Sequence, residues 1–162
     1  MINHILHVQG MNLWYLNALV KDLSEDKMVA QPVKDVTMNH AAWVLGHLPT
    51  ACDFGLSLMG EKGVCPEGWD KLFGMSSKPQ NDRKLYPSKA ELLKLIEAGY
   101  KRIVDVFKAF PATKLANPMS ADLQKIWPTV GDALVFLLTA HDATHLGQLS
   151  AWRRALGLPG VM

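Results

Sequence analysis

The sequence contains few cysteines, no long hydrophobic run and little net charge, and each of these absences excludes a class of protein. Two cysteines among 162 residues are too few for a disulfide framework or a thiolate zinc cage. The longest strongly apolar stretch, residues 133–140, is far shorter than the roughly 20 residues of a transmembrane helix. With 17 Lys and Arg against 15 Asp and Glu, the net charge is +2, and no basic stripe suggests nucleic-acid binding. We therefore expect no disulfides, no membrane and no nucleic acid as partner.

The length fits one domain over residues 1–162. A chain of this size buries roughly 70% of its unfolded surface, so it needs no disulfide or structural metal for stability. The first residues show neither the basic segment nor the cleavage site of a secretion signal, and we expect a cytoplasmic protein. Composition leaves six histidines and five tryptophans to be explained.

Four segments carry apolar side chains at alternating steps of three and four residues, the spacing that lines one face of a helix. They span about residues 2–23, 38–59, 88–110 and 129–156. A capping-box pattern at Ser88 and Glu91 begins the third segment, and Gly60 and Gly157 follow the second and fourth. No segment alternates with period two for long enough to form a strand. The sequence predicts an all-α four-helix bundle.

The connection between the second and third segments, residues 60–87, is unusually long. A helix of about 22 residues is about 33 Å long, and a connection of this size can travel that distance. It therefore predicts a crossover that lets helices two and three lie parallel instead of forming a hairpin. Its aromatic residues, Trp69 and Phe73, suggest that it packs on the bundle.

Three histidines interrupt the apolar rows of the second and fourth segments: His47, His141 and His145. A buried imidazole needs a hydrogen bond or a metal ion, because burial without a partner costs free energy. His141 and His145 are one helical turn apart, so both rings can reach one ion. The pattern alone leaves two interpretations open: a shared metal site, or three core histidines with separate hydrogen bonds.

Other polar and aromatic residues near these rows are weaker candidates. His40 lies about 10.5 Å along the helix from His47, too far to share an ion, and we expect a structural or pocket residue near the helix start. His4 and His7 lie off the best apolar row and are expected at the surface. Four further residues are candidates for a pocket or for contacts behind the ligands, with ordinary core packing as the alternative: Trp43, Gln148, Gln9 and Trp152.

Pro49 follows His47 by two residues within the second segment. Proline removes the backbone hydrogen bond to Leu45 and should kink the helix. Our hypothesis is that this kink adjusts the direction of His47. A straight helix, or a break that leaves His47 outside the bundle, would contradict it.

At these residues the chain resembles the DinB/YfiT-like superfamily of four-helix metal-binding proteins. The matching stretches are MNHAAWVLGHL at residues 38–48, HDATHLGQL at 141–149 and RRALGLP at 153–159. The loop segment WDKLFG at 69–74 and the helix entry YPS at 86–88 resemble further family features. Two positions depart from the family pattern, since Asp142 stands where Glu is frequent and Thr144 replaces a larger residue.

The resemblance implies a bundle with a long second connection and a divalent metal ion held by His47, His141 and His145. Family members are associated with zinc, nickel or iron, and some are transferases or isomerases that use a low-molecular-weight thiol. Homodimers are common among them. A metal ion, a thiol cofactor and a second copy of the chain are therefore expected partners besides a small-molecule substrate.

Three neutral nitrogen ligands without a thiolate describe an open metal site instead of a closed structural one. Such a site can acidify a bound water towards a pKa of about 7 or ionise a thiol. We therefore expect a metal-dependent enzyme acting on a small molecule, with thiol-dependent S-transfer as the leading reaction. The alternatives are a non-catalytic metal-binding or stress-response interaction protein, and a metal-dependent hydrolase. No further catalytic residue is predicted, because Cys52 points away from the site and Cys65 reads as a free loop cysteine.

Overall fold

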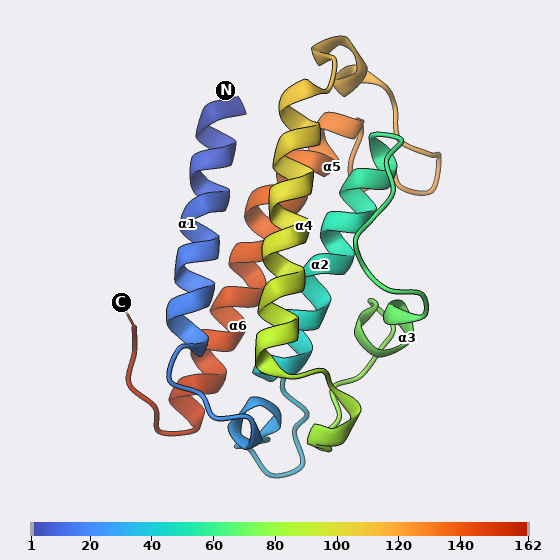
Figure 1. Cartoon of the computed structure of the whole chain (residues 1–162). Helices are drawn as coiled ribbons and strands as arrows, with labels where there is room; N and C mark the ends of the chain where they lie inside the picture. The colour runs from blue at the N-terminus through green and yellow to red at the C-terminus, as the bar shows by residue number, and fades with distance from the viewer. Residues whose placement is uncertain (1, 162) are drawn as a thin grey trace.

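The computed structural model describes residues 2–161, and this part of the chain is helical without a β-strand (Figure 1). One isolated bridge joins Pro118 and Thr129. A π-helical segment, Leu137–His141, connects the fifth helix to the sixth, and three short 3₁₀ turns lie between helices. The α-helices are α1 (Ile2–Val20), α2 (Ala41–Leu58), α3 (Trp69–Phe73), α4 (Lys89–Ala109), α5 (Val130–Phe136) and α6 (Asp142–Ala155), and the 3₁₀ turns are Asp26–Val29, Arg83–Leu85 and Ala112–Ala116. The predicted all-α bundle is confirmed.

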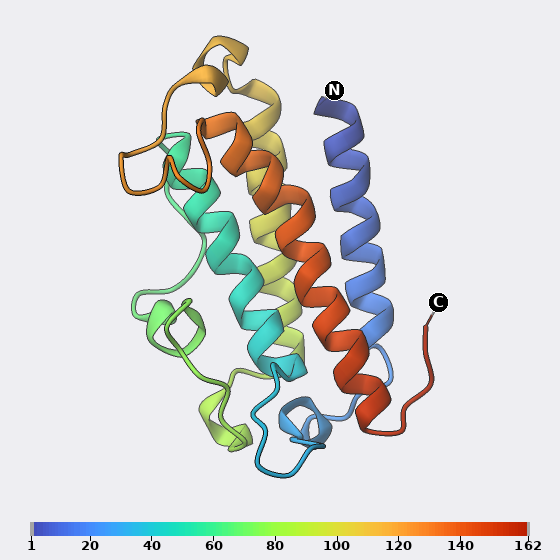
Figure 2. The same cartoon turned by 180° about the vertical axis from the view of Figure 1, so that it is seen from behind.

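The direction of the long helices confirms the crossover. α2 and α4 lie side by side and run the same way, opposite to α1 and to the α5–α6 segment (Figures 1 and 2). Residues 59–88 connect the upper end of α2 to the lower end of α4, and α3 within them packs against α2 (Figure 1). The crossover therefore covers the outer side of the helix that carries His47.

Local capping explains where two of the helices begin. Ser88 caps α4 with the predicted capping box, because its hydroxyl accepts from the Glu91 N–H and the Glu91 carboxylate accepts from the Ser88 N–H. α2 begins three residues later than predicted, because His40 is its N-cap in extended conformation. The His40 Nδ1 accepts from the Trp43 N–H at 3.2 Å. α1 also ends earlier than predicted, at Val20 instead of residue 23.

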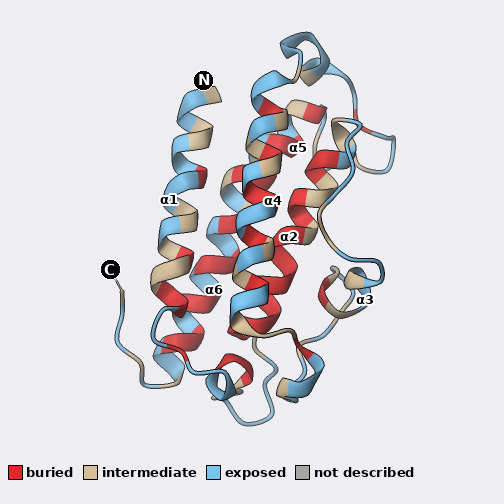
Figure 3. Cartoon of the chain, in the orientation of Figure 1, coloured by how far each residue is buried: buried red, intermediate tan, exposed pale blue. Residues whose placement is uncertain are grey.

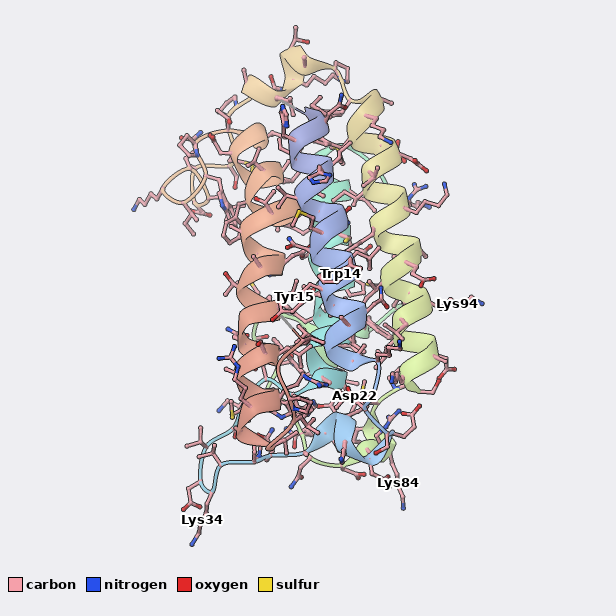
Figure 4. The ribbon with its side chains drawn as sticks, turned by 90° about the vertical axis from the view of Figure 1, so that its left-hand side faces the viewer. Trp14, Tyr15, Asp22, Lys34, Lys84 and Lys94 are labelled. Carbon is pink, nitrogen blue, oxygen red and sulfur yellow. The ribbon has the colours of Figure 1, made fainter. Side chains whose placement is uncertain are left out.

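Buried residues lie on the inward faces of the long helices, while their outer faces are exposed (Figure 3). α1 lies between α6 and α4, and Trp14 on it is 59% exposed (Figure 4). Near the lower end, Arg153 of α6 is buried and forms an ion pair at 2.6 Å with Asp22, just after α1. Among residues 2–161, no helix combines the length and apolar character that crossing a membrane requires.

The fourth predicted helix is not α-helical throughout, because Leu137–His141 form a π-helical segment. Hydrogen bonds in a π turn close from residue i to i+5, so the turn holds more residues than an α turn. The buried row therefore steps by four from Leu138 to Asp142 and Leu146, and Gln148 is exposed. The apolar spacing of residues 129–156 predicts His145, Gln148 and Trp152 on the inward row and does not include Asp142. In the structure His145 and Trp152 are buried as predicted, whereas Gln148 is exposed and Asp142, directly after the π segment, is buried.

Candidate metal centre

The side chains of His47, His141 and His145 meet between α2 and the start of α6. One ring nitrogen of each lies within 4.8 Å of those of the other two. The Nε2 atoms of His47 and His141 are 3.3 Å apart. His47 and His145 are 4% and 9% exposed, so the group lies inside the bundle. These three residues form a cluster that could hold a metal ion.

His47 is fixed from two directions. Its Nδ1–H donates to the carbonyl oxygen of Phe73 at 2.7 Å, and because a carbonyl can only accept, the proton must be on Nδ1. Trp43, one helical turn earlier, stacks on the imidazole with 4.6 Å between ring centroids and 10° between planes. The Trp43 indole N–H donates in turn to the Ser77 hydroxyl at 2.9 Å. The Nε2 lone pair of His47 is therefore directed to the other two histidines.

The Phe73 carbonyl is held in place by the docking of α3 on Gly46. The Phe73 ring is fully buried, and a Cβ atom at Gly46 would lie 2.0 Å from its Cε1 atom. The Trp69 indole N–H donates to the Gly46 carbonyl at 2.8 Å. Only glycine allows this approach, so the residue before His47 positions the loop that holds His47.

His145 is held by a side chain instead of a backbone group. Its Nδ1–H donates to Gln148 Oε1 at 3.0 Å, and the same oxygen accepts from Asn39 Nδ2 at 2.9 Å. Ordinary core packing, the alternative for Gln148, does not apply, because Gln148 is exposed. With the proton on Nδ1, the His145 Nε2 lone pair is available to an ion. Asn39 and Gln148 also line a hollow of about 320 Å³.

His141 has no such support. Its Nδ1 atom is buried without a hydrogen-bond partner among residues 2–161. The nearest acidic group is the carboxylate of Asp142, whose Oδ1 atom lies 3.8 Å from this nitrogen. The other carboxylate oxygen, Oδ2, accepts from the buried Tyr100 hydroxyl at 2.6 Å.

Burial shapes the protonation of the cluster. It lowers the pKa of His145 to about 3, with a further contribution from the neighbouring rings of His47 and His141. Burial also lowers the pKa of His47, while the Phe73 carbonyl opposes that shift by accepting its N–H. Both rings are therefore neutral at pH 7, which is the form that ligates a metal ion.

The residues present fit a divalent ion. Metal–nitrogen bonds of 2.0–2.1 Å at tetrahedral angles separate two ligand nitrogens by about 3.3 Å, and the Nε2 atoms of His47 and His141 have this spacing. Hydrogen bonds at Nδ1 of His47 and His145 leave Nε2 as the ligating atom, as is usual for metal-bound histidines. Three nitrogen ligands leave at least one coordination position open to water or substrate.

The remaining candidates do not make hydrogen bonds to the cluster. The fully buried His40 caps α2, and its Nε2–H donates to the Gln80 carbonyl at 2.8 Å. Trp152 is a core residue whose indole N–H donates to the Ala30 carbonyl at 2.7 Å. Gln9 is buried, and its Nε2 has no hydrogen-bond partner among the described residues. α2 continues through Pro49 to Leu58 with His47 inside the bundle, and a kink that directs His47 stays a prediction.

Sequence reasoning missed the groups that support the histidines: Gly46, the Phe73 carbonyl, Asn39, Asp142 and Tyr100. One signal was available, since a glycine directly before a predicted ligand in a helix favours a close approach by another segment. The Phe73 carbonyl, at the end of α3 and 26 residues from His47, accepts through the main chain, and no side-chain pattern in the sequence indicates it.

A scan against models of protein families gives a match. The family model described as the DinB superfamily matches residues 14–149, a range that contains all three histidines of the cluster. The search of curated proteins gives no match.

Proposed function

The chain belongs to the DinB superfamily, and from that premise and the histidine cluster we propose that it is a metal-dependent enzyme acting on a small molecule. His47, His141 and His145 are the proposed ligands. The observation that carries the proposal is the fixed protonation of His47 and His145, whose Nδ1–H groups donate away from the cluster and leave both Nε2 lone pairs directed into it.

Imidazole ligands suit zinc, nickel and ferrous iron, and the proposal covers all three. An ion bound there would act as a Lewis acid on a water or thiol at its open position. The chain's own residues would orient the ligands. The Phe73 carbonyl orients the His47 ring, Gln148 orients the His145 ring, and the Trp43 indole covers one face of His47. The proposed place for a small molecule is the hollow beside Asn39 and Gln148, the two side chains that support His145.

Thiol-dependent S-transfer is the proposed reaction, with the thiol supplied by a low-molecular-weight cofactor. The chain's own thiols do not fit the role of nucleophile. Burial raises the pKa of Cys52, and burial together with the nearby Asp53 carboxylate raises the pKa of Cys65. Both thiols therefore stay protonated at pH 7, and the proposed thiol nucleophile is that of the cofactor. Water in place of the thiol would give a hydrolase, which is the alternative reaction.

The test of the metal site is elemental analysis of protein purified without a histidine tag. We expect close to one divalent ion per chain after reconstitution. His145→Ala should largely abolish binding, while His4→Ala, at an exposed position on α1, should not. A small fraction of one ion per wild-type chain, even after reconstitution, would contradict the proposal.

The test of the reaction is a screen of electrophilic substrates with and without low-molecular-weight thiols. Turnover that requires both the ion and a thiol supports S-transfer, and turnover with water alone supports the hydrolase. The low exposure of His47 and His145 favours a second candidate, a non-catalytic metal-binding protein. That candidate predicts bound metal without turnover in every arm of the screen.

We also propose a homodimer. Its support is a group of exposed apolar side chains on α1, where Val8, Met11 and Trp14 are 40%, 56% and 59% exposed. Trp14 is labelled on α1 in Figure 4. Sedimentation velocity at working concentration should give the mass of two chains. A monomer would contradict the proposal.

A further inference from the structure

In the described part of the chain, the buried carboxylate of Asp142 has a hydrogen-bond donor at only one of its two oxygens. Asp142 is 3% exposed, and the Tyr100 hydroxyl donates to its Oδ2 atom at 2.6 Å. Among residues 2–161, no lysine or arginine forms an ion pair with it. A buried charge without a cationic or hydrogen-bonded partner costs free energy, so Oδ1 of this carboxylate needs a donor.

His141 lacks a hydrogen-bond partner among the described residues on the side that faces Asp142. Its Nδ1 atom is buried without a hydrogen-bond partner, although its Nε2 faces His47 at 3.3 Å. The distance from Nδ1 to Asp142 Oδ1 is 3.8 Å, so an approach of about 1 Å would form a charge-assisted hydrogen bond. Side chains at adjacent helical positions normally point apart. Here the π-helical segment ends at His141 and Asp142 begins α6. The two side chains lie close together at this junction.

We propose that Asp142 is a positioning residue for the metal ligand His141, and that Tyr100 holds Asp142 in place for this role. The inference rests on the proposed metal site. With an ion at Nε2 of His141, the imidazole proton would be on Nδ1. This N–H would donate to Asp142 Oδ1, while Oδ2 continues to accept from the Tyr100 hydroxyl. Carboxylates that accept from ligating histidines orient the ring and raise its basicity, and their loss weakens metal affinity by about 10- to 100-fold.

The test is a zinc titration of the full chain against a competing chelator, for the wild type, Asp142→Asn and Tyr100→Phe. We expect Asp142→Asn to weaken affinity by about 10- to 100-fold. In the amide, one of the two positions that face Tyr100 and His141 becomes an NH2 group, which donates and cannot accept from either of them. Tyr100→Phe leaves both carboxylate oxygens in place and should weaken affinity less. The matched control is Asp105→Asn on α4, whose carboxylate is exposed and paired with Lys101, and it should leave affinity unchanged.

Thermal unfolding of the metal-free variants separates positioning from a structural role. Asp142→Asn removes a poorly compensated buried charge, so we expect the metal-free Tm to stay the same or rise while zinc affinity falls. Parallel losses of metal-free stability and affinity would overturn the inference, as would equal zinc affinity in Asp142→Asn and the wild type. If Asp142→Asn does not fold, Tyr100→Phe decides, and unchanged affinity there overturns it. A wild type that binds no zinc refutes the metal site itself, which is a different outcome.

Discussion

The histidine cluster is supported differently on its two sides. His47 lies on α2, and its Nδ1–H donates to a backbone carbonyl, whereas the Nδ1 atoms of His145 and His141, on the α6 side, face side chains. On the α2 side, Phe73 and Trp43 hold the ring by a hydrogen bond and a stacked face. On the α6 side, the exposed Gln148 holds His145, and the Nδ1 atom of His141 lies 3.8 Å from the Asp142 carboxylate.

This difference determines how each side responds to mutation. A backbone carbonyl cannot be removed by substituting its residue, so the α2 side changes only when the loop that carries Phe73 moves. Side-chain supports can be removed one at a time, so the α6 side should allow stepwise changes in metal affinity. The position of His47 is therefore tied to the stability of the fold, whereas the supports of His145 and His141 can be changed one at a time.

The largest effect is expected from Gly46→Ala on the α2 side. The added Cβ would lie 2.0 Å from the buried Phe73 ring and displace α3, with a loss of about 1–3 kcal/mol in the free energy of unfolding. Displacement also withdraws the Phe73 carbonyl from His47, so zinc affinity should fall together with stability. Denaturant unfolding and chelator competition measure the two effects.

Gly147→Ala on α6 is the matched control. Gly147 lies between His145 and Gln148, but a Cβ there meets no atom within 4 Å. Alanine is the better helix former by up to about 1 kcal/mol, so stability should rise and zinc affinity should hold. Equal destabilisation by the two substitutions would show that α3 does not dock on α2 as described.

The metal-free protein should lose stability in mild acid, and the α6 side should contribute strongly. Burial lowers the pKa of His145 to about 3 from its usual 6.5, and the unfolded chain therefore binds more protons than the folded chain between these values. Stability is full above about pH 6.5 and falls as the pH decreases. Between pH 6.5 and 5, His145 should account for a loss on the order of 1 kcal/mol in the free energy of unfolding.

Denaturant unfolding of metal-free wild type, His145→Gln and His4→Gln at pH 7, 6 and 5 measures this dependence. His145→Gln should flatten it, and His4→Gln should leave it as in the wild type. The dependence will not vanish, because burial also lowers the pKa of His47 and His40. A wild type equally stable at pH 7 and pH 5 would contradict the expected burial of the cluster.

The sequence predicted the bundle, the crossover and the capping box at Ser88 because apolar spacing and capping patterns are local properties. The same local reasoning failed at two positions of the fourth helix, which a π-helical segment interrupts: Gln148 is exposed and Asp142 is buried. The structure brings His47, His141 and His145 together. Apolar spacing predicted that these three face inward, but it left open whether they share a metal ion or make separate hydrogen bonds.

Periodicity could not predict the groups that form hydrogen bonds to the three histidines from behind. Phe73 acts through its main chain, which no side-chain pattern encodes. Tyr100 and Asp142 meet across two helices whose relative rotation depends on the crossover and on the π segment. These contacts follow from the packing of the whole bundle, so they could be found only after the fold was known.

The smallest effects are expected from the exposed support of His145. Gln148→Ala removes the acceptor of the His145 Nδ1–H, and because water can replace it at this exposed position, zinc affinity should fall by about tenfold, at the lower end for such partners. Asn39→Ala removes only the hydrogen bond that orients the Gln148 amide, a loss of about 0.5 kcal/mol or two- to threefold in affinity.

In the double variant, Asn39→Ala should add nothing to Gln148→Ala, because Asn39 acts on His145 only through that amide. Chelator competition on the four proteins measures this coupling. Additive losses would mean that Asn39 influences the site by another route, and the α6 side would then not be the chain of separable supports that distinguishes it from α2.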